Sequence, residues 1–233
     1  MDILEVLASH VLTGQQIALG AEAAIYSVRY LGVSLVVKYR YPRRYMNPVL
    51  AEELINRRTR LEAKIMEKAA SNGVCVPRLL VAAISKGMLV MEKLEGTRLD
   101  NVLSSIYPSL EKAYNLSSLF VKIGKSLALL HKANIVHGDF TVSNVIVDSS
   151  DRNFPCIIDF GLSRFSGDVE DRAMDLRVFL KSIESSFPRY LGFINKAVLE
   201  GYSIIASSFY KEVVARLKDM ELRGRYVEER RKN

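Results

Sequence analysis

The stretch that decides the fold is His137-Gly138-Asp139-Phe140-Thr141-Val142-Ser143-Asn144, and Asp159-Phe160-Gly161 follows twenty residues after Asp139. Two short apolar runs, residues 145–147 and 156–158, lie between these motifs and predict a small hairpin. We expect this hairpin to bring Asp139 and Asn144 close to Asp159. Phosphoryl transfer uses a carboxylate beside the attacking oxygen, together with a carboxylate and an amide oxygen that hold Mg²⁺ on the phosphates. These three side chains supply those groups.

The composition describes a globular chain with a basic surface. Its 233 residues are enough for one two-lobed domain or two small domains, and 49% apolar residues can bury a substantial core. The net charge of +7 is compatible with binding a nucleic acid or another polyanion. A basic, solvated surface without such a partner explains the charge equally well.

The pattern of the cysteines and the lengths of the apolar runs indicate the cellular compartment of the protein. Cys75 and Cys156 each lie in an apolar segment, without C-x-x-C spacing and with only three histidines in the chain to complete a zinc site. We therefore expect both to be reduced core residues, as in a cytosolic protein. No run reaches the roughly 18 apolar residues of a membrane span, and the N-terminus lacks the pattern of a signal peptide. The sequence thus predicts a cytoplasmic protein.

The first part of the chain predicts an antiparallel sheet packed by one helix. Apolar residues recur at helical spacing over residues 49–70, and Gly73 ends that helix. Tight turns at Leu31-Gly32 and Lys86-Gly87 join neighbouring strands. The β-favouring runs are residues 17–19, 24–30, 33–39, 79–85 and 88–93.

Three features of this part are candidates for phosphate binding. The turn Gly20-Ala21-Glu22-Ala23 consists mostly of small residues, which lets backbone N–H groups approach an anion. Lys38 lies within an apolar strand, where an ammonium group needs a counter-ion. Glu62, on the predicted helix, is a candidate partner that would hold the ammonium group against nucleotide phosphates. Two simpler interpretations stay open, namely an ordinary hairpin turn at 20–23 and a solvated helix glutamate at 62.

A group of arginines precedes the predicted helix and continues along it. This basic patch would suit RNA or a protein partner, although no aromatic residues interleave with it as on a base-reading surface. The arginines are Arg40, Arg43, Arg44, Arg57, Arg58 and Arg60.

The remainder of the chain is predicted to be mainly helical. Residues 92–96 connect the two parts, and their extended backbone can offer carbonyl and N–H groups to an adenine edge. Residues 223–233 are charged and poor in core-forming residues, so we expect a basic tail that is mobile when alone. Helices are predicted at about 99–106, 116–133, 170–185, 189–201 and 203–222.

The order of these features resembles that of the protein-kinase superfamily, with a small-residue loop, a strand lysine, a helix glutamate, Asp-x₄-Asn and Asp-Phe-Gly. Within it, several strings resemble one lineage, the small atypical serine/threonine kinase/ATPase subunit of the KEOPS (EKC) complex. These strings are Gly20-Ala21-Glu22-Ala23, Arg58-Thr59-Arg60-Leu61-Glu62-Ala63, residues 137–144, Asp159-Phe160-Gly161-Leu162-Ser163, Glu170-Asp171-Arg172-Ala173-Met174-Asp175-Leu176 and Arg223-Gly224-Arg225.

The resemblance implies an α+β, protein-kinase-like, two-lobed fold that forms a single minimal domain over residues 1–233. The N-lobe, about 1–93, would be a small antiparallel β-sheet with one helix. A hinge at about 92–96 would lead to a reduced, mainly helical C-lobe at about 97–222, followed by the basic tail.

The resemblance also implies a role for each candidate of the helical part. Asp139 would be the catalytic residue that orients the attacking hydroxyl group or water, or accepts its proton. Asn144 and Asp159 would ligate Mg²⁺, with Mn²⁺ as an alternative. Asp175 would brace the catalytic loop, and His137 is better interpreted as a packing residue that hydrogen-bonds to hold that loop than as a general base.

For the first part, the resemblance implies that ATP is the bound nucleotide. Gly20, Ala21, Glu22 and Ala23 would form the phosphate loop. Lys38 would hold the α- and β-phosphates and pair with Glu62. The backbone of Glu92 and Leu94 would bind adenine.

Two departures from ordinary protein kinases narrow the expected activity. Gly138 replaces the arginine with which kinases regulated by loop phosphorylation bind the phosphate. Only about eight residues separate Gly161 from the next predicted helix, and no Ala-Pro-Glu segment follows, so the usual peptide-docking platform is absent. We therefore predict an ATP-dependent phosphotransferase, ATPase or both.

The resemblance implies that this enzyme acts within a KEOPS-like complex that includes the threonylcarbamoyl-transferase subunit and supports threonylcarbamoyladenosine formation in tRNA. Two other functions stay open. A small-molecule phosphotransferase of the aminoglycoside or choline type has a similar catalytic string, although this chain has little spare length for its substrate-binding insertions. A binding module with a structural nucleotide site could instead recruit tRNA through the basic patch and tail.

Overall fold

The computed structural model describes residues 15–20, 23–42, 46–148 and 154–232. The chain divides into two compact units. Unit 1 comprises Met1–Ala70 and Val76–Glu95, and unit 2 comprises Ser71–Cys75 and Gly96–Asn233.

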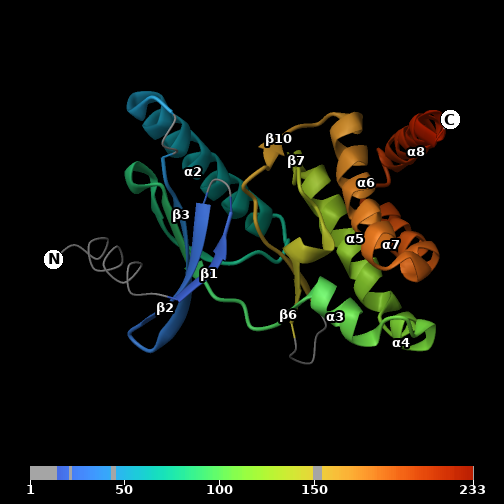
Figure 1. Cartoon of the computed structure of the whole chain (residues 1–233), viewed down its shortest axis with the longest axis horizontal. Coiled ribbons are helices and arrows are strands. Elements are labelled where there is room, and N and C mark those ends of the chain that lie inside the picture. Colours follow the sequence, from blue (N-terminus) through green and yellow to red (C-terminus); the bar gives the residue numbers. More distant parts are fainter. Residues whose placement is uncertain (1–14, 21–22, 43–45, 149–153, 233) are drawn as a thin grey trace. The chain divides into compact units, whose positions relative to one another are not determined.

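Unit 1 contains an antiparallel five-stranded sheet with the strand order β1-β2-β3-β5-β4 (Figure 1). The β2–β3 turn consists of Leu31 and Gly32, whose positive φ angles of 49° and 82° suit a two-residue hairpin. The five predicted strands and this turn are therefore confirmed, except that the fourth strand ends at Ala83 rather than at residue 85. The strands are β1 (Gln15–Leu19), β2 (Ala23–Tyr30), β3 (Val33–Arg40), β4 (Leu79–Ala83) and β5 (Met88–Glu92), and the 3₁₀ turn η1 (Ile84–Lys86) joins the last two.

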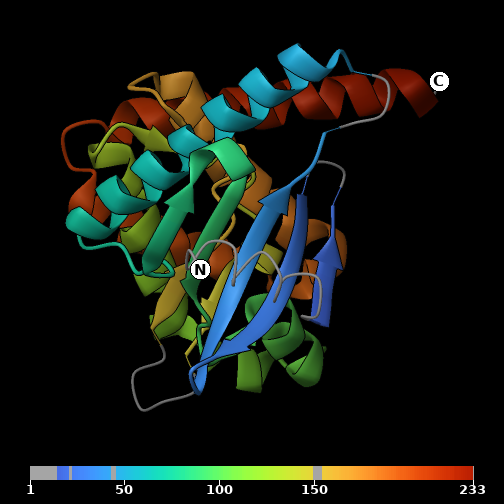
Figure 2. The ribbon, with the colours of Figure 1, turned by 90° about the vertical axis from the view of Figure 1, so that its left-hand side faces the viewer.

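Among the described residues of unit 1, the α-helix is α2 (Pro48–Ser71), which confirms the helix predicted at 49–70. Figure 2 shows it above the sheet strands in that view. The buried face differs from the predicted apolar stripe, because Leu50 is 61% exposed whereas Glu62 is 3% exposed. The buried residues Thr59, Glu62, Met66 and Ala69 follow the three-to-four-residue spacing of one helix face. A charged residue thus lies on the buried face of this helix.

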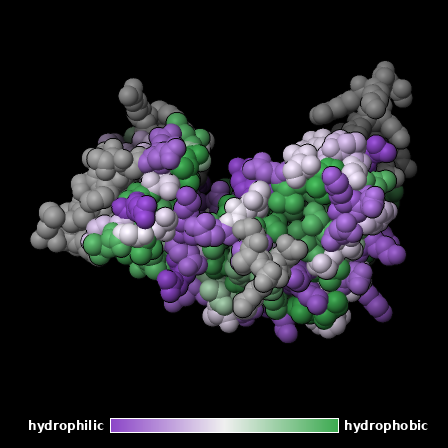
Figure 3. Space-filling model, turned by 90° about the horizontal axis from the view of Figure 1, so that it is seen from below, coloured by the Kyte–Doolittle hydropathy of each residue, from purple (hydrophilic) through white to green (hydrophobic). Residues whose placement is uncertain are grey.

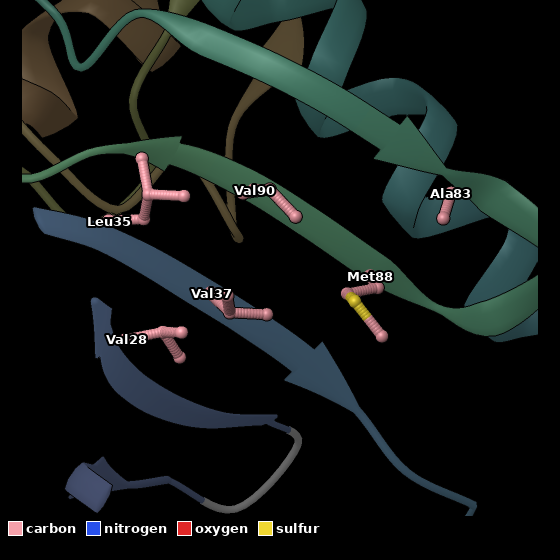
Figure 4. Packing of buried hydrophobic residues seen from close by; sticks show 6 residues of the cluster. All are labelled: Val28, Leu35, Val37, Ala83, Met88 and Val90. Atoms are coloured by element: carbon pink, nitrogen blue, oxygen red, sulfur yellow. The ribbon is translucent and has the colours of Figure 1, made fainter. Parts of the chain in front are cut away.

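The two faces of the sheet carry different side chains. Buried apolar residues from β2, β3, β4 and β5 form one cluster (Figure 4), consisting of Val28, Leu35, Val37, Ala83, Met88 and Val90. Successive strand residues point to opposite faces. Leu35 and Val37 of β3 therefore belong to the cluster, while Lys38 and Arg40 point to the other side.

Unit 2 is mainly helical. Three short strands, β6 (Thr97–Arg98), β8 (Val145–Val147) and β9 (Pro155–Ile157), form one sheet, and β7 (Ile135–Val136) pairs with β10 (Arg164–Phe165). The β8–β9 pairing confirms the predicted hairpin. The helices are α3 (Leu99–Ile106), α4 (Leu110–Tyr114), α5 (Ser117–Lys132), α6 (Val169–Ser186), α7 (Leu191–Ile205) and α8 (Tyr210–Lys232), with 3₁₀ turns η2 (Val142–Asn144) and η3 (Pro188–Tyr190).

Some helix boundaries differ from the predictions. The short helix α4 was not predicted, and α7 continues through Gly201 to Ile205, so that α8 begins at Tyr210 rather than at 203. Gly201 does not end its helix because it lies at a helix contact. An added Cβ atom would come within 1.9 Å of the Val121 carbonyl oxygen of α5. Helix α8 continues to Lys232, so the segment expected to be a mobile tail has a helical backbone over 223–232.

Cys75 and Cys156 form a disulfide bond, with their Cα atoms 4.5 Å apart. The prediction of two reduced cysteines is therefore wrong. The Ile157 N–H group donates to the Cys75 carbonyl at 2.8 Å, and this bond aligns residues 71–75 with β9. The two cysteines are 81 positions apart in the sequence, so their spacing gave no indication of the pairing.

Within the described ranges, every helix is too short or too polar to cross a bilayer. On the face drawn in Figure 3, apolar residues are interspersed with polar ones.

Candidate functional site

The loop between β7 and β8 in unit 2 holds Asp139 and Asn144. The Asn144 side-chain amide donates to the Asp139 carbonyl oxygen at 2.9 Å and to its carboxylate Oδ2 at 3.0 Å. Both residues are half-buried. The position of the Asp139 carboxylate is therefore set by its neighbour in the same loop.

Asp175 of α6 fixes the start of this loop. Its carboxylate is 1% exposed and accepts hydrogen bonds from the His137 N–H at 2.7 Å and the Gly138 N–H at 2.8 Å. The His131 Nε2 lies 3.1 Å from the same carboxylate, and Tyr202 Oη lies 2.6 Å from His131 Nδ1. Burial lowers the pKa of His131 and raises that of the Tyr202 hydroxyl. A neutral His131 then donates to Asp175 and accepts from Tyr202, which satisfies every member of the chain of hydrogen bonds. Asp175 thus braces the loop, as the resemblance implied.

His137 connects this loop to the segment that carries Asp159. Its side chain is fully buried, its Nε2 lies 3.1 Å from the Ile158 carbonyl, and the Asp139 N–H donates to its Nδ1 at 3.3 Å. Burial lowers the pKa of His137, so the neutral ring donates through Nε2 and accepts through Nδ1. Its interpretation as a packing residue that holds the loop is confirmed.

Gly138 has a structural reason to be glycine. Its φ angle is +80°, and an added Cβ atom would lie 2.4 Å from the Leu162 carbonyl oxygen. A side chain at this position would therefore be strained and would collide with backbone. The absence of an arginine here is a requirement of this backbone.

Asp159 follows β9 and is exposed, with a positive φ angle of 62°. The preceding residue, Ile158, donates its N–H to the Asn144 carbonyl at 3.0 Å, so the two segments are aligned. The Asp159 Oδ1 accepts from the Gly161 N–H at 3.2 Å. A non-glycine residue with positive φ is costly and is often found at functional sites.

Asn144 and Asp159 fit a hard divalent cation. Oxygen atoms are the ligands that Mg²⁺ prefers, and these side chains offer a carboxylate and an amide oxygen. The Asn144 side-chain nitrogen donates its hydrogen bonds to Asp139, so the side-chain oxygen of Asn144 points away from Asp139.

In unit 1, Glu62 of α2 pairs with two cations of β3. The Lys38 Nζ lies 2.8 Å from Glu62 Oε1, and the Arg40 Nη2 contacts Glu62 Oε2. The predicted Lys38–Glu62 pair is confirmed, and the alternative of a solvated glutamate is wrong. Arg40 was expected in the exposed basic patch, but it is 5% exposed and bound to Glu62. The alternation of the strand places it on the same face as Lys38.

The predicted phosphate loop is described at its two ends. The Gly20 N–H donates to the Ala23 carbonyl at 2.9 Å, and Ala23 is the first residue of β2. The Tyr41 hydroxyl donates to the Gly20 carbonyl at 2.9 Å. Ala21 and Glu22 lie outside the described residues.

Glu92 and Leu94, the predicted adenine-binding residues, lie at the end of unit 1. The Glu92 N–H donates to the Arg78 carbonyl at 3.0 Å, so an adenine contact by Glu92 is restricted to its carbonyl oxygen. Leu94 follows β5 and is half-buried.

Sequence reasoning missed two supports of the site. Ser143 in the catalytic loop donates its hydroxyl to Asp100 Oδ2 of α3 at 3.0 Å. Asp100 lies in the first turn of α3, where an acidic residue is common for helix stability, so nothing in the sequence distinguished it. Arg40 was detectable, because it lies two positions after Lys38 on a strand.

The fold and the arrangement of Asp139, Asn144 and Asp159 define a protein-kinase-like domain. A model of the protein kinase domain matches residues 25–182. The structure is similar in fold to WaaP in complex with acyl carrier protein, with a TM-score of 0.69 and 14% identity over 97% of this chain and 92% of that one. The Rio2 kinase of Chaetomium thermophilum, in a complex with ADP, Mg²⁺ and phosphoaspartate, gives a TM-score of 0.59 and 17% identity over 96% of this chain and 75% of that one.

Relatives with similar sequences show which family of protein-kinase-like proteins the chain belongs to. A probable serine/threonine-protein kinase BUD32 homolog of Archaeoglobus fulgidus is 35% identical over 91% of this chain and 97% of the relative. The KEOPS complex subunit Bud32 of Pyrococcus abyssi is 33% identical over 90% of this chain and 94% of the relative. The chain belongs to the Bud32 family of protein kinases. It also matches 36% of the length of a probable bifunctional tRNA threonylcarbamoyladenosine biosynthesis protein of Methanothermobacter thermautotrophicus, at 35% identity over 91% of this chain.

Proposed function

We propose that this chain is a Mg²⁺- and ATP-dependent kinase/ATPase that acts in a KEOPS-like complex and supports threonylcarbamoyladenosine modification of tRNA. The observation that carries the proposal is that a member of the Bud32 family retains both the buried Lys38–Glu62 pair and the Asp139–Asn144 pair. Phosphoryl transfer depends on positioning and charge neutralisation, and these pairs fix the groups that provide both.

Unit 2 carries the chemical step. The Asp139 carboxylate orients the attacking hydroxyl group or water and takes up its proton, while Asn144 holds that carboxylate in place. Asn144 and Asp159 would hold Mg²⁺, which neutralises charge on the phosphates when bound. His137 and Asp175 keep the loop in this conformation through the hydrogen bonds that they make to its backbone.

Unit 1 binds the nucleotide. Lys38 donates to the α- and β-phosphates, and Glu62 limits the positions that its ammonium group can take. Small residues at the phosphate loop let backbone N–H groups approach the phosphates, and Tyr41 holds the start of that loop at Gly20. The carbonyl of Glu92 and the backbone of Leu94 would contact adenine.

The partners are the other subunits of the complex, including the threonylcarbamoyl-transferase subunit. Relatives from Dictyostelium discoideum and Yarrowia lipolytica are named EKC/KEOPS complex subunits and are 31% and 32% identical to this chain. The bifunctional relative has a further part beyond the 36% of its length that this chain matches. We propose that the complex works in the cytoplasm.

Contact with tRNA would involve the exposed arginines of α2. Arg57 and Arg60 are exposed. Neutralising phosphate contacts makes binding depend on salt concentration. We therefore expect Arg57→Gln combined with Arg60→Gln to weaken tRNA binding by the complex and to reduce its salt dependence.

The deciding experiment follows the γ-phosphate of labelled ATP, with and without the partner subunits and tRNA. Transfer to water or to a serine or threonine hydroxyl should be lost in Asp139→Asn, by about a hundredfold or more. Asp219→Asn, at an exposed position of α8, is the matched control and should keep the wild-type rate. Equal turnover in Asp139→Asn and the wild type would reject the proposed function.

A further inference from the structure

Glu62 is bound by two buried cations rather than one. Each of its carboxylate oxygens contacts a different residue, Oε1 contacting Lys38 at 2.8 Å and Oε2 contacting Arg40. The exposed fractions are 7% for Lys38, 5% for Arg40 and 3% for Glu62. Burying a charge is costly unless an opposite charge and hydrogen bonds compensate it. The trio holds two positive charges and one negative charge.

Arg40 is held at this position by its backbone. Its N–H donates to the Gly87 carbonyl at 2.8 Å, where the chain turns between β4 and β5. Gly87 has a φ angle of +63°, and an added Cβ atom there would lie 2.8 Å from the Arg40 carbonyl oxygen. The turn therefore packs closely against the end of β3 and fixes the origin of the Arg40 side chain.

In the segments that the structure describes, the Arg40 guanidinium group donates a hydrogen bond to Glu62 through one of its three nitrogen atoms. Among the described residues, its Nε and Nη1 atoms are buried and have no hydrogen-bond partner. A buried arginine that leaves two donor groups unused costs free energy. Within the described part of the chain, Glu62 is thus the hydrogen-bond partner of this side chain, and Glu62 is also the partner of Lys38, the lysine that we propose binds phosphate.

We propose that Arg40 is a positioning residue for nucleotide binding. By holding Oε2, it fixes the position of the Glu62 carboxylate, so that Lys38 is oriented through Oε1 for contact with the phosphates. This inference deepens the proposed function and rests on its assignment of Lys38 to the ATP phosphates. It assigns a role in nucleotide affinity to a residue outside the phosphate loop and the catalytic loop.

The first measurement is the affinity of the full chain for a fluorescent ATP analogue with Mg²⁺. In Arg40→Gln, Glu62 is free to pair with Lys38 through both oxygens, and we expect affinity to fall about tenfold, the size of one hydrogen bond to a charged group. The turnover number at saturating ATP should fall much less than the affinity. Arg40→Lys, which keeps the charge, should recover part of the loss. Arg29→Gln, at an exposed arginine of the same unit, should bind as the wild type does.

A double-mutant cycle separates positioning from a general effect on the fold. If Arg40 acts through Glu62, then Arg40→Gln should cost no further affinity in a Glu62→Gln background. If Arg40→Gln lowers the affinity by the same factor in the wild-type chain and in the Glu62→Gln variant, the inference is overturned. If Arg40→Gln does not fold, as judged by circular dichroism, the same cycle is run with Arg40→Lys, where we expect about a threefold loss that again disappears with Glu62→Gln.

The outcomes also separate this inference from the proposed function. A wild-type chain that does not bind the ATP analogue would overturn both. A wild-type chain that binds it, together with an Arg40→Gln variant of equal affinity, would overturn the role of Arg40 alone.

Discussion

The two units hold their functional residues by different means. In unit 1, Glu62 is held by the side chains of Lys38 and Arg40, so the geometry depends on charges carried by flexible groups. In unit 2, the carboxylate of Asp175 accepts from the backbone of His137 and Gly138, so the geometry depends on the path of the chain. Catalysis depends on the positions of the reacting groups. We propose that side-chain charges position Lys38 for the phosphates, and that the braced backbone positions Asp139 for the chemical step.

The largest effect is expected when the backbone brace of unit 2 is removed. Asp175→Ala leaves the N–H groups of His137 and Gly138 and the buried His131 without their acceptor, and the free energy of unfolding should fall by about 3–5 kcal/mol. Chemical denaturation measures it. Asp168→Ala is the control on the same helix, where loss of an exposed N-cap should cost about 1 kcal/mol. Equal losses in the two variants would show that Asp175 is not a brace.

Reduction of the Cys75–Cys156 disulfide should be the next largest effect. The bond closes a long loop, with a sequence separation of 81, and its loss should cost about 2–4 kcal/mol through the unfolded chain. Both cysteines belong to unit 2. We therefore expect Cys75→Ala combined with Cys156→Ala to lower the melting temperature of unit 2 and to leave the affinity of unit 1 for the ATP analogue unchanged. A weaker nucleotide affinity without any change in melting would contradict this division of roles.

Gly138→Ala tests whether the catalytic loop depends on its backbone conformation. The positive φ angle of 80° and the 2.4 Å contact of an added Cβ atom with the Leu162 carbonyl should cost about 1–3 kcal/mol and shift Asp139. Phosphoryl transfer should therefore fall strongly while nucleotide binding is retained. Gly192→Ala, where an added Cβ atom meets no atom within 4 Å, is the control. Wild-type transfer by Gly138→Ala would refute the requirement.

The smallest effect is a pH dependence of unit 2. Burial lowers the pKa of His131 and His137 in the folded protein, whereas unfolded histidine titrates near its ordinary value of 6.5. As the pH falls below 6.5, the unfolded chain binds protons that the folded protein does not, so stability should decrease. Melting temperatures between pH 8 and pH 5 measure this. His131→Gln should flatten the curve, and an unchanged slope would exclude His131 as a source.

The sequence predicted most of the architecture, because local patterns determine it. The strands of unit 1 alternate between tight turns such as Leu31-Gly32, and the helices of unit 2 carry apolar residues at regular spacing. Gly201 misled the prediction, because glycine inside a helix was interpreted as a helix end although it serves a close contact between α5 and α7. Spacing alone did not reveal the disulfide.

The candidate site was predictable at positions where the residue type is rarely found for purely structural reasons. Lys38 in an apolar strand required a partner, and the structure supplies Glu62. A support such as Asp100 was harder to predict, because it is an ordinary residue of a first helical turn whose role arises from a contact with a distant segment. The identities of Asn144 and Asp159 as metal ligands stay predictions.

The alternation of β3 also limits how the length of this chain can vary. Lys38 pairs across the sheet with Leu89, and Val37 pairs with Val90. If the strand absorbed one inserted or deleted residue before Lys38, every following side chain would change face. Both cations would then point into the apolar cluster of Val37 and Met88, and Glu62 would lose its partners. Natural variants should therefore carry their insertions and deletions at exposed turns such as Leu31-Gly32, and none within β3 itself.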